Sequence, residues 1–288
     1  MDAPTAGRNA KMFEPIHSMS YFAPEVSEHL VAVGLEVGGM TYFAGRSAAM
    51  GAVAPSVVAA TFYTFNPEVV AGYLPRAWEL ASPEAIVAAR YAGAGAALRR
   101  LLGDAVVGSV EMAEAADIAA IAARATRPEG RPLFAAHAAV EQPAEPHLSL
   151  WHSLTLLREY RGDGHIVALQ AAGLSGIEAL ITHTATGAGF TEKAALSRRG
   201  WSREQWDAAS NDLRDRGLLA DNGTLTELGT EIREVTEDVT DDLAFAPWAE
   251  LGDAGLDRLT ELLTPMRAAI VDAGTYPPNL FGPRWGKW

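Results

Sequence analysis

Cysteine is absent from this chain of 288 residues. Its absence excludes disulfide bonds, thiolate metal sites and a cysteine nucleophile. Seven histidines are present, but no HExxH or HxH motif places two of them as metal ligands. His147, His152, Asp163 and His165 crowd the centre of the chain. Their spacing alone does not bring together the three or four ligands that zinc or iron needs, so we expect no metal site.

Glycine-rich nucleotide motifs are also missing. No GxxxxGK[ST] phosphate loop occurs, and Gly93-Ala94-Gly95 lacks the third glycine and the preceding strand of a dinucleotide site. No GxSxG elbow presents a serine nucleophile. We therefore expect the protein to work without a cofactor.

Long apolar runs are absent as well. No stretch approaches the ~18–20 apolar residues of a membrane span, and residues 1–13 have no apolar core of signal-peptide length. Hydrophobic residues still make up 49% of the chain, enough for a packed core. We expect a cytoplasmic protein without membrane contact.

Positive charge is scarce. The chain has 23 lysines and arginines against 36 acidic residues, which gives a net charge of −13, and both halves are acidic. Nucleic acid binding depends on basic side chains at the phosphates, so a nucleic acid partner is not favoured. An acidic balance is also common in proteins that are only soluble.

The sequence does contain clear signals for the beginnings of helices. Asn66-Pro67 and Ser82-Pro83 are caps followed by proline at the first helical position. Four prolines between residues 127 and 146 mark a domain boundary. We predict a helical domain at 1–146, and a second domain at 147–288 that ends in a helix and an aromatic tail.

Residues 201–216 carry the clearest local signal in the second domain. Ser202 and Gln205 have the spacing of a capping box, and Trp201 and Trp206 stand at the hydrophobic-staple positions. The predicted helix has three arginines against four carboxylates, which is a poor charge for a helix that reads DNA.

Residues 217–226 extend this helix into a predicted winged helix. Gly217 ends the helix, Leu218-Leu219 and Thr224-Leu225 have the pattern of a β-hairpin, and Thr226 caps another helix. Earlier in this domain, 161–164 (Arg-Gly-Asp-Gly) is predicted to break a helix. The predicted fold class is mainly α, with a helical N-terminal domain and a winged-helix-like C-terminal domain bearing a short β-hairpin wing.

Several segments carry a family resemblance. The segment LRDRGLLADNGTLTELGTEIREVTEDVTDDLA at 213–244 resembles the recognition helix, wing and following helix of MarR-like regulators. The whole chain resembles an actinobacterial SalK-like helix-turn-helix family through EPIHSMSYFAPE (14–25), YFAGRSAAMG (42–51), FNPE (65–68) and LWHSLTLLREYRGDGHIVAL (150–169). Members occur in natural-product gene clusters, so the resemblance implies a role in specialised metabolism. It also directs attention to Arg158 and His165 as ligand-binding candidates.

The residues themselves indicate further candidates. Glu14, His17 and Tyr21 lie one helical turn apart if a local helix forms there, and this trio combines a carboxylate, an imidazole and a phenol. The alternative is an N-terminal segment that only packs through its aromatic residues. His17 is a candidate for acid–base catalysis, and Glu14 and Tyr21 are candidates for ligand binding.

Aromatic residues concentrate in the first domain and include Tyr42 and Tyr63. Such a set usually forms core, and it also suits an apolar ligand pocket with a few polar groups. Arg46, one turn after Tyr42, is positioned to bind an acidic group of a ligand or one of the chain's own carboxylates.

His152, Thr155 and Glu159 share one face of a predicted helix. A histidine and a carboxylate there are suited to general acid–base work, so His152 is the second catalytic candidate. The alternatives are a solvated polar face and a histidine bonded to a carbonyl group.

These patterns support three functions. The first is a small-molecule-binding protein of natural-product metabolism, interpreted as a cofactor-independent tailoring enzyme on a winged-helix scaffold that does not bind DNA. The second is a MarR-like, ligand-responsive transcriptional regulator, for which a homodimer is expected. The third is a binding protein that sequesters a metabolite without turnover.

Overall fold

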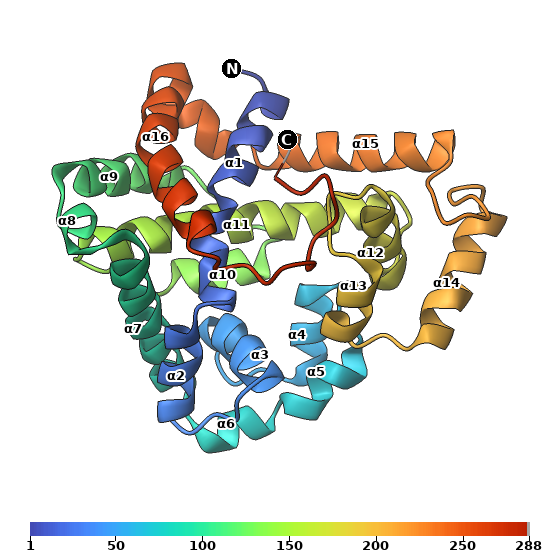
Figure 1. Ribbon diagram of the computed structural model, residues 1–288, viewed down its shortest axis with the longest axis horizontal. Coiled ribbons are helices and arrows are strands. Elements are labelled where there is room, and N and C mark those ends of the chain that lie inside the picture. Colours follow the sequence, from blue (N-terminus) through green and yellow to red (C-terminus); the bar gives the residue numbers. More distant parts are fainter. Residues whose placement is uncertain (287–288) are drawn as a thin grey trace.

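Helices form almost all of the regular structure in this computed structural model, which describes residues 1–286 (Figure 1). Two short 3-10 helices, η1 (Met19–Tyr21) and η2 (Ala48–Met50), follow α1 and α3. The α-helices are α1 (Ala3–Ser18), α2 (Pro24–Ala32), α3 (Gly39–Ser47), α4 (Pro55–Phe62), α5 (Pro67–Tyr73), α6 (Arg76–Leu80), α7 (Pro83–Leu102), α8 (Asp104–Val107), α9 (Val110–Arg124), α10 (Pro132–Ala138), α11 (Pro146–Ala171), α12 (Gly176–Ala185), α13 (Glu192–Arg199), α14 (Arg203–Asp215), α15 (Glu227–Leu243) and α16 (Ala246–Asp272).

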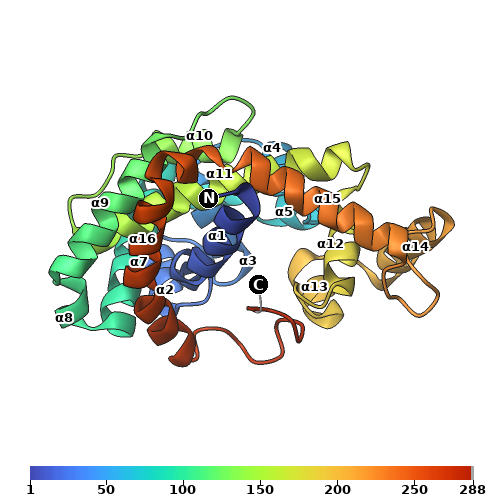
Figure 2. The same cartoon turned by 90° about the horizontal axis from the view of Figure 1, so that it is seen from above.

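Two clusters of buried apolar side chains organise these helices. The larger one unites α1 to α7, α9, α10, the first half of α11 and α16, with Trp151 of α11 fully buried in it. The smaller one joins the end of α11 to α12, α13 and α14 and includes Trp206 and Leu213. Figures 1 and 2 show α12 to α14 at the opposite end of the molecule from α7 to α9. The division into domains at residue 146 stays a prediction.

Local capping explains where several helices begin. The side chain of Asn66 accepts a hydrogen bond from the backbone N–H of Glu68 at the start of α5. Ser202 and Gln205 form the predicted capping box of α14, and Trp206 is buried behind it. The local helix on which the grouping of Glu14, His17 and Tyr21 depends does form: α1 includes Glu14 and His17, with Pro15 inside it, and Tyr21 lies in η1.

The predicted helix break at 161–164 is wrong, because α11 runs without interruption from Pro146 to Ala171. The carboxylate of Asp163 accepts hydrogen bonds of 3.0 and 2.9 Å from the backbone N–H groups of Leu133 and Phe134. Asp163 therefore caps a neighbouring helix, α10, rather than its own. At Gly164 a Cβ atom would lie 2.7 Å from Nη1 of Arg131, so this glycine serves close packing.

The predicted β-hairpin wing is also wrong: no strand occurs within residues 1–286. Leu219 and Leu225 form a single isolated antiparallel bridge, closed by a 2.8 Å hydrogen bond from Ala220 N to Thr224 O. The ladder stops there because Thr226 already caps α15. The mainly α class is confirmed, and the turn forms without a wing.

The described helices were compared with the length and hydropathy that a membrane-spanning helix needs. No single helix is both long and apolar enough to cross a membrane, and only α11 and α12 taken together, at a 99° bend, reach that length and composition. The first half of α11 packs into the larger core through Leu150, Trp151 and Leu154.

Candidate ligand-binding cavity

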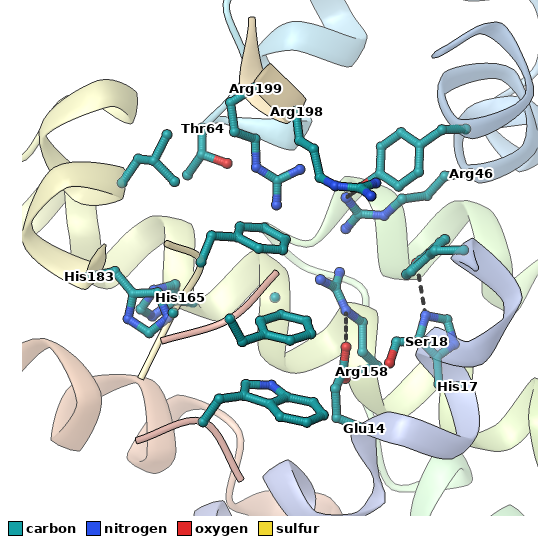
Figure 3. A pocket seen from close by; sticks show the side chains of 18 of the residues that line it. Glu14, His17, Ser18, Arg46, Thr64, Arg158, His165, His183, Arg198 and Arg199 are labelled. Atoms are coloured by element: carbon teal, nitrogen blue, oxygen red, sulfur yellow. Dashed lines mark hydrogen bonds and ion pairs between the residues drawn. The ribbon is translucent and has the colours of Figure 1, made fainter. Parts of the chain in front are cut away.

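A cavity of about 1410 Å³ lies between the N-terminal helices and the region around α13. Side chains of α1, α2, α3, α11, α12, α13 and α15 line it, together with the C-terminal tail. Figure 3 shows arginine side chains converging on its interior from several of these elements. The cavity is therefore built from segments that are far apart in the sequence.

The C-terminal tail forms one wall of the cavity. Phe281 stacks on Phe190 with ring centroids 5.2 Å apart, and Trp285 stacks on Phe281 at 4.3 Å. Backbone hydrogen bonds of 2.8 and 2.9 Å fasten the tail to the loop between α12 and α13. The tail therefore packs on the rest of the protein through its aromatic residues, although Lys287 and Trp288 lie outside the described residues.

His17 is buried at the cavity wall between two hydroxyl groups. Its Nδ1 lies 2.9 Å from Oγ1 of Thr155, and its Nε2 lies 2.8 Å from the hydroxyl of Tyr21. Thr155 donates its own proton to the carbonyl oxygen of Trp151, so it must accept from His17 Nδ1–H. Nε2 is then left to accept from Tyr21. Burial holds the pKa of His17 well below its usual value and raises that of Tyr21 to about 12.

An ion-pair cluster lies beside this histidine. Glu159 receives two hydrogen bonds from Arg46, at 3.1 and 2.8 Å, and one from Arg158 at 2.5 Å. Burial alone would raise the pKa of Glu159, but Arg158 and Arg46 hold it well below its usual range. Glu14 lies 3.6 Å from Nε of Arg158, and burial raises its pKa. Arg46 thus binds one of the chain's own carboxylates.

Arg199, the last residue of α13, differs from these paired arginines. Its guanidinium group lies 4.1 Å from the ring centroid of Phe65 and 5.0 Å from that of Phe190. No carboxylate within residues 1–286 forms an ion pair with it, and its Nε has no hydrogen-bond partner. Burial lowers its pKa. The pKa of Tyr42 is lowered as well: burial alone would raise it, but Arg46 and Arg199 outweigh that effect.

The charge of the cavity wall is opposite to that of the whole protein. Among the described lining residues, nine are basic and four are acidic, and the buried Glu159 behind the wall adds one more carboxylate. The whole chain has a net charge of −13. The basic residues are Lys11, Arg46, Arg90, Arg158, Arg161, Arg198, Arg199, Arg233 and Arg284.

A second polar group lies at the α15 side of the cavity. Nδ1 of His165 lies 2.8 Å from Oγ1 of Thr240, and burial lowers the pKa of His165 to about 3 and that of His183 to about 4. Nearby, Arg233 bonds to Glu237 at 2.8 Å but leaves Nε and Nη1 without partners. Among the described residues, no three histidine or acidic side chains gather as metal ligands would.

The cavity brings together seven of the nine predicted site residues: Glu14, His17, Tyr21, Tyr42, Arg46, Arg158 and His165. The other two lie elsewhere. Tyr63 donates a 2.6 Å hydrogen bond to the carbonyl oxygen of Leu174, and Nδ1 of His152 lies 2.5 Å from the hydroxyl of Tyr91.

The predicted partnership between His152 and Glu159 does not form. Both side chains are buried, at 2% and 1% exposure, so their helix face is not a solvated one. However, His152 turns to Tyr91, while Glu159 turns to the arginines of the cavity. Burial lowers the pKa of His152 to about 4.

Arg198 and Arg199 are cavity residues that the sequence did not single out for this site. In the sequence they directly precede the predicted DNA-reading helix. In the structure Arg199 turns inward, and both side chains line the cavity (Figure 3). The sequence contains one signal that bears on their position: Gly200 follows them and ends α13 in the left-handed conformation, at φ 74°.

The segment from α13 to α14 forms a helix, a turn and a second helix. The outer face of α14 is exposed, and its arginines are engaged within the chain. Arg203 lies 2.7 Å from Glu192 and 3.5 Å from Asp207, and Arg216, just after α14, lies 2.7 Å from Glu178. A phosphate group would have to compete with these carboxylates for Arg203 and Arg216, whereas Arg214 bonds only to the amide oxygen of Asn211.

The beginning of α14 is fastened to the N-terminal helices. The Asn66 amide donates to the carbonyl oxygen of Gly200 at 3.0 Å and to Gln205 at 3.3 Å. The indole N–H of Trp201 donates to the carbonyl oxygen of Thr64 at 2.9 Å. The N-terminal residues of a recognition helix normally contact base edges, whereas here that end adjoins α5.

Comparison with known proteins gives one family. A model described as "Helix-turn-helix family" matches residues 6–277. The chain therefore belongs to this helix-turn-helix family. No curated protein and no solved structure matches it.

Proposed function

We propose that this helix-turn-helix protein binds a small organic molecule in the cavity between its first helices and α13. The observation that carries the proposal is the cavity itself. Its volume of about 1410 Å³ exceeds the ~300–1,000 Å³ of most ligand pockets. Aromatic rings of the tail and of α3 line it, and polar groups such as Tyr21 and Tyr42 converge on it, which is the usual composition of a small-molecule site.

Fluorescence of N-phenyl-1-naphthylamine, a neutral aromatic probe, tests this proposal. Thr64 lines the cavity, so Thr64→Trp fills part of the space. Thr264 is exposed on α16 and does not line the cavity, which makes Thr264→Trp the matched control. We expect one probe molecule per chain in the wild type and in T264W, and loss of binding in T64W. Absence of binding in the wild type, or unchanged binding in T64W, overturns the proposal.

A ligand-responsive regulator is the second candidate, and family membership together with the exposed α14 favours it. In such a protein a ligand beside Arg199 acts on α14 through the three-residue turn between α13 and α14. A mobility-shift assay at low salt with the protein's own upstream DNA tests it; a salt-dependent shift supports the regulator, and no shift at micromolar protein removes it. The MarR-like and SalK-like resemblances and the homodimer stay predictions, the last checked by light scattering after size exclusion.

The tailoring-enzyme hypothesis rests on His17, whose neutral imidazole reaches the cavity through the hydroxyl of Tyr21. His152 lies outside the cavity and so offers a matched comparison. If the protein is an enzyme of natural-product metabolism, His17→Ala abolishes turnover and His152→Ala retains it. Full activity in H17A removes the acid–base role. Ligand binding without any turnover favours a protein that sequesters its metabolite.

A further inference from the structure

Four arginines of the cavity wall form no ion pair with a carboxylate of the described residues: Arg90, Arg198, Arg199 and Arg284. Arg46 and Arg158 share the carboxylate of Glu159, and Glu14 lies against Arg158. Arg199 has no acidic partner among the described residues. A cation removed from bulk water is unfavourable unless an anion compensates it. We infer that the ligand of this cavity is an organic acid whose anionic group lies against Arg199, an inference that rests on the proposed binding function.

The placement of Arg199 shows which of its atoms are available. Phe65 and Phe190 lie near its guanidinium group at 4.1 and 5.0 Å, in cation–π contact. The N–H donors of a guanidinium lie in its plane. The Nε of Arg199 is buried without a partner, so an anion in the cavity has to approach the Nη side of the group, near the hydroxyl of Tyr42. A carboxylate or sulfonate in that plane accepts two parallel hydrogen bonds, which is the geometry that arginine binds most strongly.

Neighbouring arginines add to the positive charge of Arg199. Figure 3 shows the guanidinium groups of Arg46, Arg158, Arg198 and Arg199 pointing toward one region of the cavity. Two carboxylates, Glu14 and Glu159, lie within ion-pairing distance of this group. An incoming anion therefore meets an excess of positive charge at this part of the wall, where Arg46 is buried and Arg199 is half-buried.

The rest of the wall indicates the body of the ligand. Phe22, Phe281 and Trp285 line the cavity, and Phe281 and Trp285 stack with an interplanar angle of 5°. Flat rings of this kind bind flat apolar groups. An inorganic anion has no apolar surface to pack on these rings, so the ligand class is an aromatic acid rather than free phosphate or sulfate.

Two fluorescent probes test the inference. 1-Anilinonaphthalene-8-sulfonate has the same aromatic body as N-phenyl-1-naphthylamine and adds one sulfonate. We expect the wild type to bind the sulfonate probe about tenfold more tightly than the neutral one, as one charge-assisted contact allows. Arg199→Met is expected to remove this preference, so that the sulfonate and neutral probes bind with similar affinity. Arg99→Met, an exposed arginine of α7 outside the cavity, is the matched control and keeps the preference.

The outcomes separate the two claims. Equal binding of both probes by the wild type, or an unchanged preference in R199M, overturns the acid assignment while ligand binding stands. Failure of both probes to bind the wild type overturns the proposed function and the acid assignment with it. The ratio of the two probe affinities is measured on the wild type alone, so it tests the acid assignment even if R199M does not fold. Arg199→Lys keeps the charge and is expected to retain part of the preference for the sulfonate probe.

Discussion

The cavity and the outer face of α14 carry opposite charge, although arginine supplies most of the cations of both. Nine basic and four acidic side chains line the cavity, whereas three arginines meet four carboxylates over residues 203–216. Arg203 and Arg216 are paired with carboxylates, while Arg199 has none. The difference teaches that unpaired arginines are more numerous at the cavity wall than on the face of α14, which is the arrangement that the proposed binding of an organic anion requires.

Removing the buried carboxylate is the strongest test of this comparison. Glu159→Gln leaves Arg46 and Arg158 without their shared anion, which is expected to lower the free energy of unfolding by about 3–5 kcal/mol. Asp207→Asn, at an exposed pair on α14, is expected to lower it by less than about 1 kcal/mol. Urea denaturation measures both. Equal costs for the two variants would break the comparison.

Low pH is expected to destabilise the protein because histidines that line the cavity are held neutral in the folded state. Burial, and after it the positive charge of Arg233, lowers the pKa of His183 to about 4, below the usual value of 6.5. Below pH 6.5 the unfolded chain binds protons that the folded chain does not, so the free energy of unfolding falls from pH 6.5 toward pH 4, by up to about 1.4 kcal/mol per pH unit. Asp163, whose pKa burial raises to about 6, offsets part of the loss.

His183→Gln isolates this contribution. Urea denaturation between pH 7 and pH 4.5 is expected to show a shallower loss of stability for the variant than for the wild type. An identical slope in H183Q would show that His183 is not held neutral in the folded state.

Transferring positive charge to the outer face tests the other side of the comparison. Asp207, Asp212 and Asp215 are exposed, so replacing all three by lysine makes the α14 face basic. We expect at least about tenfold tighter binding to duplex DNA at low salt than for the wild type, and loss of that binding as salt is raised. Fluorescence anisotropy measures this. A wild type that binds as tightly as the variant would show that the acidic helix already serves DNA.

The smallest expected effect concerns the anchored end of α14. Asn66→Ala removes the cap of α5 and the hydrogen bond to Gly200, which is expected to cost about 1 kcal/mol of stability. Asn211→Ala, on the exposed side of α14 with only Arg214 as partner, should stay within about 0.5 kcal/mol. Thermal unfolding of the two variants compares them, and a larger loss in N211A would contradict the anchoring.

Local signals predicted the helices well and the pairing of strands poorly. The capping box of Ser202 and Gln205 depends only on neighbouring residues, so spacing in the sequence is sufficient to find it. A wing requires two strands joined by several backbone hydrogen bonds. The segments on either side of the turn at Asn222 are too short to form such strands before Thr226 caps α15. At Gly164 the helix continues where the local sequence predicted a break, and the missing side chain leaves room for Arg131.

The site could be predicted only in part, for a similar reason. Glu14, His17 and Tyr21 share a local helical segment, and the sequence indicated them together. Arg199 could be recognised only from tertiary structure, because Phe65 and Phe190, which contact it, come from distant segments. His152 had the right residue type and spacing, but the packing of α7 places Tyr91 against it.

A parallel titration of the wild type and Thr64→Trp with the sulfonate and neutral naphthylamine probes tests the central claim most directly. The claim is that the basic cavity, not the surface, binds an organic anion. It predicts one sulfonate probe per chain, bound about tenfold more tightly than the neutral probe, with both lost in T64W. Sulfonate binding that survives in T64W, or that occurs without any preference over the neutral probe, would contradict it.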